Sequence, residues 1–156
     1  MVSNSDLINL YSQRILALAA SIPHTERLAD ADATSQKRSP LCGSTVTVDL
    51  CVTDGKVSAF GQDVKACALG QASASVIGSA IIGCTVEQLE FAHDQLLAML
   101  KSEGPVPSAP FEGLEVLLPA KEYKNRHASI MLCIKASLEA INDAQKNAAT
   151  PKGAAK

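Results

Sequence analysis

A length of 156 residues predicts one domain, and a hydrophobic content of 47% is enough for a substantial core. A net charge of −2, from 14 basic and 16 acidic residues without a basic block, argues against a nucleic-acid partner. The five irregularly spaced cysteines argue against a secreted disulfide scaffold, and no leader or membrane-spanning segment is evident, so we expect a cytoplasmic protein with no membrane contact.

The first predicted element is a helix over residues 6–21, because its apolar residues recur at helical spacing. Ser5 is its expected N-cap, and Pro23 ends it. Residues 24–40 are polar and show no period. We therefore expect a loop there.

Strands are predicted next. Residues 45–52 alternate between aliphatic and mostly polar side chains, which is the pattern of a half-buried strand. The pair Asp54-Gly55 is typical of a tight hairpin turn. Residues 57–60 then predict a second strand, and residues 64–66 a third.

The rest of the chain predicts helices. Residues 68–81 are rich in Ala, Ser and Gly, which permits close packing against a sheet. A capping box at Thr85 opens a helix that ends near Lys101. A last helix is expected from Lys121 or Asn125 to Ala144. Residues 147–156 are small and basic and are expected to form a disordered tail, which leaves one domain over residues 1–146.

Two cysteines and one histidine are the candidate site residues. Cys67 opens the small-residue helix, where free backbone N–H groups favour a thiolate. Cys42 follows a proline-containing loop, and Gly43 lets the backbone turn sharply beside it. His127 stands near the start of the last helix and could complete a set of ligands suited to zinc or to one edge of an iron–sulfur cluster. The spacing of these residues is not itself diagnostic of a metal site.

The stretch from Cys67 to Ser75 is a cysteine followed by small residues and an Ala-Ser-Ala-Ser run. It resembles the signature of the U-type iron–sulfur scaffold family, which includes IscU, SufU and the N-terminal domain of NifU. Pro40-Leu41-Cys42-Gly43 resembles the first ligand motif of that family, and His127-Ala128-Ser129-Ile130 resembles the His-Cys-Ser-Ile segment of IscU. The similarity spans residues 5–145.

This resemblance implies an α+β fold in which a three-stranded antiparallel sheet packs with four to five helices. It also implies a scaffold or carrier rather than an enzyme. Such a protein receives sulfur from a cysteine desulfurase, holds iron or a nascent iron–sulfur cluster, and passes it to recipient apoproteins. Cys42 and Cys67 would be ligands and sulfur acceptors, and His127 a third ligand.

The chain departs from the family pattern at two ligand positions. Ser44 stands where the family has aspartate, and the third cysteine is absent. Aligned on the IscU form that cysteine falls at Ala128, and aligned on the SufU form it falls at Ser129. Two alternatives therefore stay open: a zinc-dependent sulfur acceptor of the SufU type, and a degenerate member that binds no metal and acts as an interaction module.

The other cysteines are expected to lie outside the site. Cys51 is on the strand face opposite the valines, Cys84 is expected in a surface turn, and Cys133 is expected to be a small core residue.

Overall fold

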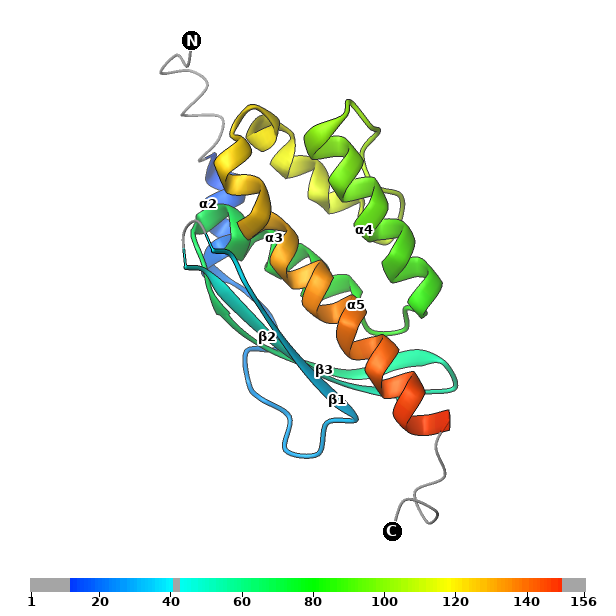
Figure 1. Cartoon of the computed structure of the whole chain (residues 1–156). Helices are drawn as coiled ribbons and strands as arrows, with labels where there is room; N and C mark the ends of the chain where they lie inside the picture. Colours follow the sequence, from blue (N-terminus) through cyan, green and yellow to red (C-terminus); the bar gives the residue numbers. More distant parts are fainter. Residues whose placement is uncertain (1–11, 41–42, 150–156) are drawn as a thin grey trace.

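A computed structural model describes residues 12–40 and 43–149. Three antiparallel strands in the order β1-β2-β3 form one sheet, with helices packed on one of its faces (Figure 1). The strands are β1 (Ala33–Arg38), β2 (Thr45–Thr53) and β3 (Lys56–Lys65). The helices are α2 (Gln13–Ala20), α3 (Ala68–Ala80), α4 (Val86–Lys101) and α5 (His127–Ala149), with 3-10 helices η1 (Glu112–Glu122) and η2 (Lys124–Arg126). The expected α+β fold is confirmed.

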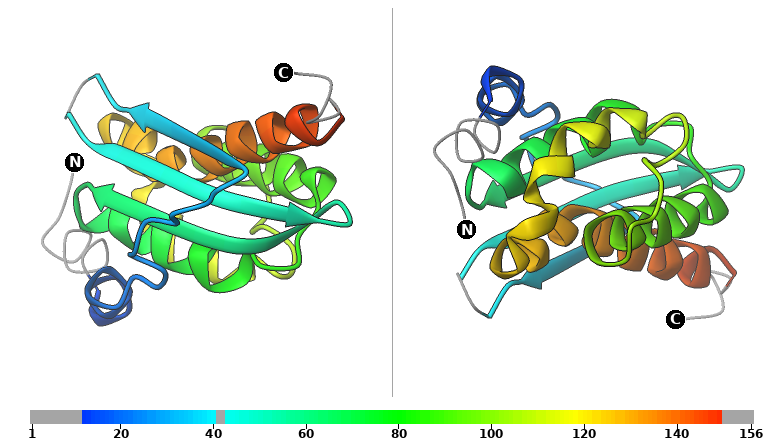
Figure 2. Two further views of the ribbon diagram at one scale, coloured as in Figure 1. Left: turned by 90° about the horizontal axis from the view of Figure 1, so that it is seen from below. Right: turned by 90° about the horizontal axis from the view of Figure 1, so that it is seen from above.

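The core lies between the inner face of the sheet and the helices. Helix α5 runs across β1 and β2, α3 lies beside it, and α4 packs against α5 and η1 (Figures 1 and 2). The largest fully buried side chains are Ile15, Leu50, Leu69, Ile77, Ile81, Leu89, Leu96, Met99, Leu100, Phe111 and Leu114. Among the described residues, no helix has the length and apolar character needed to cross a membrane.

The hairpin between β2 and β3 forms where it was predicted. Asp54 and Gly55 have φ angles of +54° and +78°, as a two-residue turn of this kind requires, and Thr53 pairs with Lys56. The prediction of separate strands at 57–60 and 64–66 is wrong, because pairing with β2 continues from one end of β3 to the other.

The third strand is instead β1, within the segment expected to be a loop. Its residues alternate between buried and exposed positions, but the buried ones are Ala33 and Ser35. A strand whose inward side chains are so small shows no hydrophobic alternation, so the sequence pattern did not reveal it.

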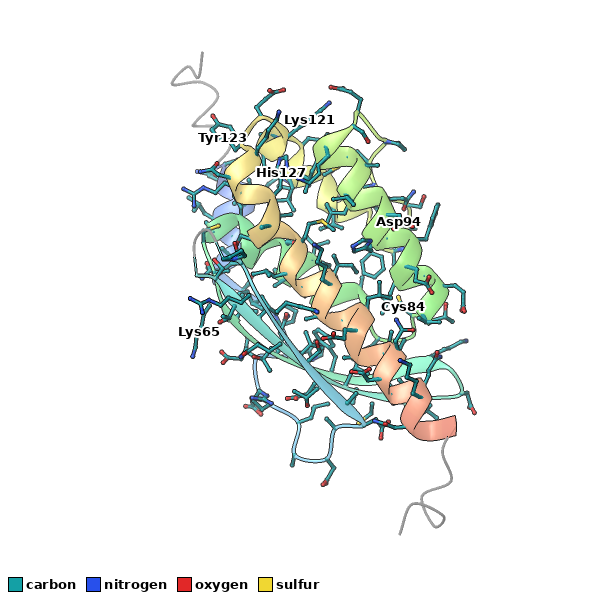
Figure 3. The ribbon with its side chains drawn as sticks, in the orientation of Figure 1. Lys65, Cys84, Asp94, Lys121, Tyr123 and His127 are labelled. Atoms are coloured by element: carbon teal, nitrogen blue, oxygen red, sulfur yellow. The ribbon has the colours of Figure 1, made fainter. Side chains whose placement is uncertain are left out.

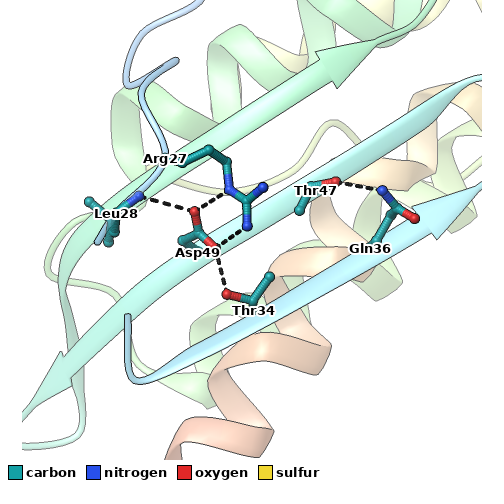
Figure 4. A network of polar contacts seen from close by, with 6 residues as sticks. All are labelled: Arg27, Leu28, Thr34, Gln36, Thr47 and Asp49. Carbon is teal, nitrogen blue, oxygen red and sulfur yellow. Dashed lines mark hydrogen bonds and ion pairs between the residues drawn. The ribbon is translucent and has the colours of Figure 1, made fainter. Parts of the chain in front are cut away.

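The outer face of the sheet is crossed by residues 22–32, which we call the crossing segment (Figure 2). It bonds to β3 where the N–H of Gln62 donates to the carbonyl of His24 at 2.8 Å. It then passes over β2, where Asp49 is fully buried beneath it (Figure 4). Because of this cover, residues 46–50 in the middle of β2 are buried on both faces, where a half-buried strand was predicted.

The ends of two helices differ from expectation. The first helix is not continuous over 6–21, because Ser12 is extended, with ψ of 163°, and caps α2 through its hydroxyl; Ser5 lies outside the described residues. The last helix begins at His127, after η2, and continues to Ala149, beyond its predicted end at Ala144. There the Asn147 amide donates to the carbonyl of Asp32 at 3.3 Å. Residues 150–156 lie outside the described part.

Candidate metal centre

Cys67 is the N-cap residue of α3 and is half-buried. Its Sγ lies 3.5 Å from the Oγ of Ser129, in the first turn of α5. The N-termini of two helices therefore meet at this thiol. Unpaired N–H groups in the first turn of α3 favour negative charge at Cys67, so the position suits a metal-bound sulfur.

A second hydroxyl extends this contact to the sheet. Ser129 Oγ donates to Ser44 Oγ at 3.3 Å, and Ser44 directly precedes β2. Both serines are buried, with 1% and 6% of their surface exposed. One sulfur and two oxygens from three elements are thus linked side by side. Ser129, the SufU-form alternative for the missing cysteine, is the one that contacts Cys67.

Cys42 lies outside the described residues, so its role as a ligand stays a prediction. Its neighbours are described: the N–H of Gly43 donates to the carbonyl of Ser39, and the N–H of Ser39 donates to the carbonyl of Ser44. Gly43 has φ of +72°, a conformation that favours glycine. The expected sharp turn after Cys42 is therefore present.

His127 is turned toward the end of η1 (Figure 3). Its Nε2–H donates to the carbonyls of Ala120 and Lys121 at 3.0 and 3.1 Å. Burial lowers the pKa of His127, and the charges of Lys101 and Lys124 lower it further. The hydrogen bonds to the carbonyls of Ala120 and Lys121 raise the pKa but do not outweigh these effects. The neutral ring keeps Nδ1 as its free lone pair, and this buried atom has no hydrogen-bond partner among the described residues. The role of His127 as a third ligand stays a prediction.

Comparison with known proteins identifies the family of this chain. No family model matches it. The crystal structure of the N-terminal part of a NifU-like nitrogen-fixing protein from Brucella abortus is 41% identical, with a TM-score of 0.88 over 90% of this chain and 98% of that one. This chain belongs to the U-type scaffold family.

Two further likenesses agree with that membership. The iron-sulfur cluster assembly scaffold protein IscU of Thermotoga maritima is 28% identical over 132 residues, which are 85% of this chain and 92% of that protein. A SufU scaffold protein from Fervidobacterium islandicum is 19% identical with a TM-score of 0.78, over 86% of this chain and 98% of that one. The latter likeness shows the fold alone.

The other described cysteines of this U-type chain have contacts of their own, none of them with Cys67. Cys84 is buried, and its thiol contacts the carbonyl of Ala80, so the expected surface position is wrong. Cys133 is a core residue, as predicted; burial raises the pKa of its thiol to about 12, and it donates to Gln62. Cys51 is half-buried and contacts the carbonyl of Asp30.

The described part of the chain holds no group of three His, Cys, Asp or Glu side chains that could bind a metal. Its donors beside Cys67 are hydroxyls. The sequence marked Ser44 and Ser129 only as departures from a pattern and gave no sign that they touch. Such a contact depends on how α5 crosses the start of the sheet, which has no local sequence signal.

Proposed function

We propose that this U-type protein is an iron–sulfur cluster assembly scaffold and not an enzyme. It accepts sulfur from a cysteine desulfurase, holds iron or a nascent cluster as cargo, and passes it to recipient apoproteins in the cytoplasm. The observation that carries the proposal is the position of Cys67, between the first turn of α5 and the start of β2, in a chain 41% identical to a NifU-like domain.

The spacing of the donor atoms supports this role. A sulfur and an oxygen on one tetrahedral zinc ion are about 3.5 Å apart, and two oxygens about 3.3 Å apart, when the bonds are about 2.3 and 2.0 Å long. The distances from Ser129 Oγ to Cys67 Sγ and to Ser44 Oγ are 3.5 and 3.3 Å. Ser129 Oγ therefore has the spacing of a metal ligand beside Cys67, and Ser44 Oγ has that spacing from Ser129.

Cys42 supplies the second thiol in this proposal, because it precedes Ser44 by two positions in the chain. His127 offers a further nitrogen through Nδ1. An imidazole that ligates a metal usually donates its other N–H to a carbonyl or carboxylate, and Nε2 of His127 makes such bonds.

A zinc-dependent sulfur acceptor is the second candidate. The Ser129 hydroxyl beside the thiol, with the Ser44 hydroxyl next to it, suits a single hard or borderline ion better than a cluster, whose surroundings are typically all sulfur. In this case the protein holds zinc and accepts sulfur without building a cluster.

Loading experiments test the proposal. The protein is incubated without oxygen with Fe²⁺, cysteine, a cysteine desulfurase and dithiothreitol, whose two electrons per sulfur reduce the persulfide sulfur to sulfide. Iron and acid-labile sulfide per chain are measured after gel filtration. We expect both in the wild type and neither in Cys67→Ser, because serine cannot supply a thiolate. Cys51→Ser is the matched control and should load like the wild type.

Other outcomes decide among the alternatives. Zinc bound to the purified protein, with no iron or sulfide retained after loading, would favour the zinc-dependent sulfur acceptor. A wild type that retains neither metal, or a Cys67→Ser variant that loads fully, would contradict the scaffold proposal.

A further inference from the structure

We infer that Gly70 is a positioning residue for this centre: it lets α3 and α5 cross so closely that Ser129 reaches Cys67. The claim that Gly70 allows this close crossing rests on contacts seen in the structure. The claim that Gly70 matters for binding the metal or cluster rests on the proposed function.

The space at Gly70 is smaller than a methyl group. A Cβ there would lie 2.6 Å from Ser129 Oγ, 2.9 Å from Ala66 Cβ and 3.1 Å from the backbone oxygen of Ser129. The first two distances are shorter than real Cβ contacts, and the backbone oxygen cannot rotate away. A methyl group would therefore either rotate the Ser129 hydroxyl away from its place beside Cys67 or push α5 away from α3.

The two segments that would move are those that carry the donor atoms. Ala66 directly precedes Cys67, and Ser129 supplies the hydroxyl that contacts its sulfur. Crowding at Gly70 thus acts on both sides of the 3.5 Å contact between Sγ and Oγ. Gly70 touches neither metal nor cargo and acts through these neighbours.

Position 70 requires glycine because there is no room for a side chain, and not because of its backbone conformation. Gly70 lies inside α3, and its φ is outside the left-handed region. In an open helical position alanine is favoured over glycine. Any harm from alanine at this position therefore reports the crowding against α5.

Gly78 gives a matched control on the same helix. A Cβ there would also lie 2.6 Å from its nearest neighbour, but that neighbour is Gln62 Nε2, followed by Pro23 Cγ at 3.1 Å. Alanine at this position crowds the core and the crossing segment, while Ser129 is not among the atoms it meets.

A metal-free test uses Ser129→Cys as a probe of distance. Diamide takes two electrons and two protons from the introduced thiol and Cys67, which leaves a disulfide that mass spectrometry of peptides measures. We expect this bond to form readily, because the native atoms are 3.5 Å apart. Adding Gly70→Ala should slow its formation by about tenfold, because disulfides tolerate little misplacement. Adding Gly78→Ala should change the rate by less than about twofold.

Thermal unfolding keeps the inference testable even if Gly70→Ala is poorly stable. Ser129→Ala removes the oxygen at 2.6 Å, so combining it with Gly70→Ala should recover part of the lost melting temperature. Combined with Gly78→Ala it should recover none. Equal behaviour of the two glycine variants in either measurement, or no disulfide in the Ser129→Cys parent, would overturn the inference.

Zinc binding connects the geometry to the cargo. In competition titrations with Zn²⁺ alone, Gly70→Ala should weaken affinity by about tenfold, a usual effect of disturbing groups around a metal site. Gly78→Ala should stay within about twofold of the wild type. If the disulfide result holds but the wild type binds neither zinc nor iron, the role of Gly70 stands and the proposed function fails. If Gly70→Ala leaves the disulfide rate unchanged, the inference about Gly70 is wrong whatever the metals do.

Discussion

Replacing Asp49 with alanine should lower the free energy of unfolding by about 2–4 kcal/mol, because a buried carboxylate with several charge-assisted hydrogen bonds is lost. Asp49 accepts from Arg27 Nε and Nη2 at 2.5 and 3.0 Å, from the N–H of Leu28 at 3.1 Å and from Thr34 Oγ1 at 2.5 Å. These bonds attach the crossing segment and β1 to β2 (Figure 4). Urea unfolding followed by circular dichroism measures the change.

Asp63 is the matched control for this prediction. It lies on the neighbouring strand, is half-exposed, and pairs only loosely with Lys65 at 3.9 Å. Exposed pairs of this kind contribute less than about 1 kcal/mol, so Asp63→Ala should unfold at nearly the wild-type urea concentration. If Asp49→Ala were equally mild, the ion pair beneath the crossing segment would not hold the fold together.

The Asp49 carboxylate should also make the free energy of unfolding depend on pH. Burial raises the pKa of Asp49, but the hydrogen bonds from Arg27, Thr34 and Leu28 outweigh burial and leave that pKa below its usual value. The unfolded chain, with an aspartate pKa of about 3.9, therefore takes up the proton first as pH falls. The contribution of Asp49 is present above about pH 4 and is lost as pH falls through the folded-state pKa.

The wild type should accordingly lose stability steeply below about pH 4, and Asp49→Ala less steeply. A residual slope should remain in the variant, because the hydroxyl of Ser35 and then Lys37 lower the pKa of Glu139. Parallel curves of stability against pH for the two proteins would contradict this account of Asp49.

Ser129→Cys should tighten zinc binding by roughly two orders of magnitude, because a thiolate replaces a neutral hydroxyl already placed beside Cys67. Ala128→Cys is the control, since it is the IscU-form alternative in the same turn of α5. We expect it to bind zinc within about threefold of the wild type, as no ligand is added beside Cys67. Competition with a chromophoric chelator measures all three affinities.

The outcome also decides which alignment applies. A gain confined to Ala128→Cys would place the missing ligand at the IscU position and contradict the geometry around Ser129. If neither variant binds zinc more tightly than the wild type, the placement of the third ligand is wrong. Because binding requires deprotonated thiols, the gain should be larger at pH 8 than at pH 6.

Features set by local chemistry could be predicted from the sequence. The Asp54-Gly55 turn, the capping box at Thr85 and Gln88, and the start of α3 after Cys67 all formed as expected. Each depends on a few adjacent residues whose backbone preferences agree with the fold. The family resemblance supplied the α+β class in the same way, through the run from Cys67 to Ser75.

Features set by distant contacts could not be predicted. The strand β1 is defined by pairing with β2, and its small inward side chains carry no signal of their own. The burial of Asp49 depends on a segment that passes over it from another part of the chain. At the metal centre, the contact of Ser129 with Cys67 depends on the crossing of two helices, which Gly70 permits only because of what faces it.

The position of α5 also bears on how the protein emerges from the ribosome. This helix covers the inner face of the sheet, yet the whole sheet, up to Lys65, is synthesised well before it. At about 5–20 residues per second, the strands wait on the order of ten seconds for that cover. During this interval the nascent chain exposes the aliphatic side chains of β2. Folding is complete only when α5 packs on strands that are far from it in sequence, and contacts of this kind form slowly.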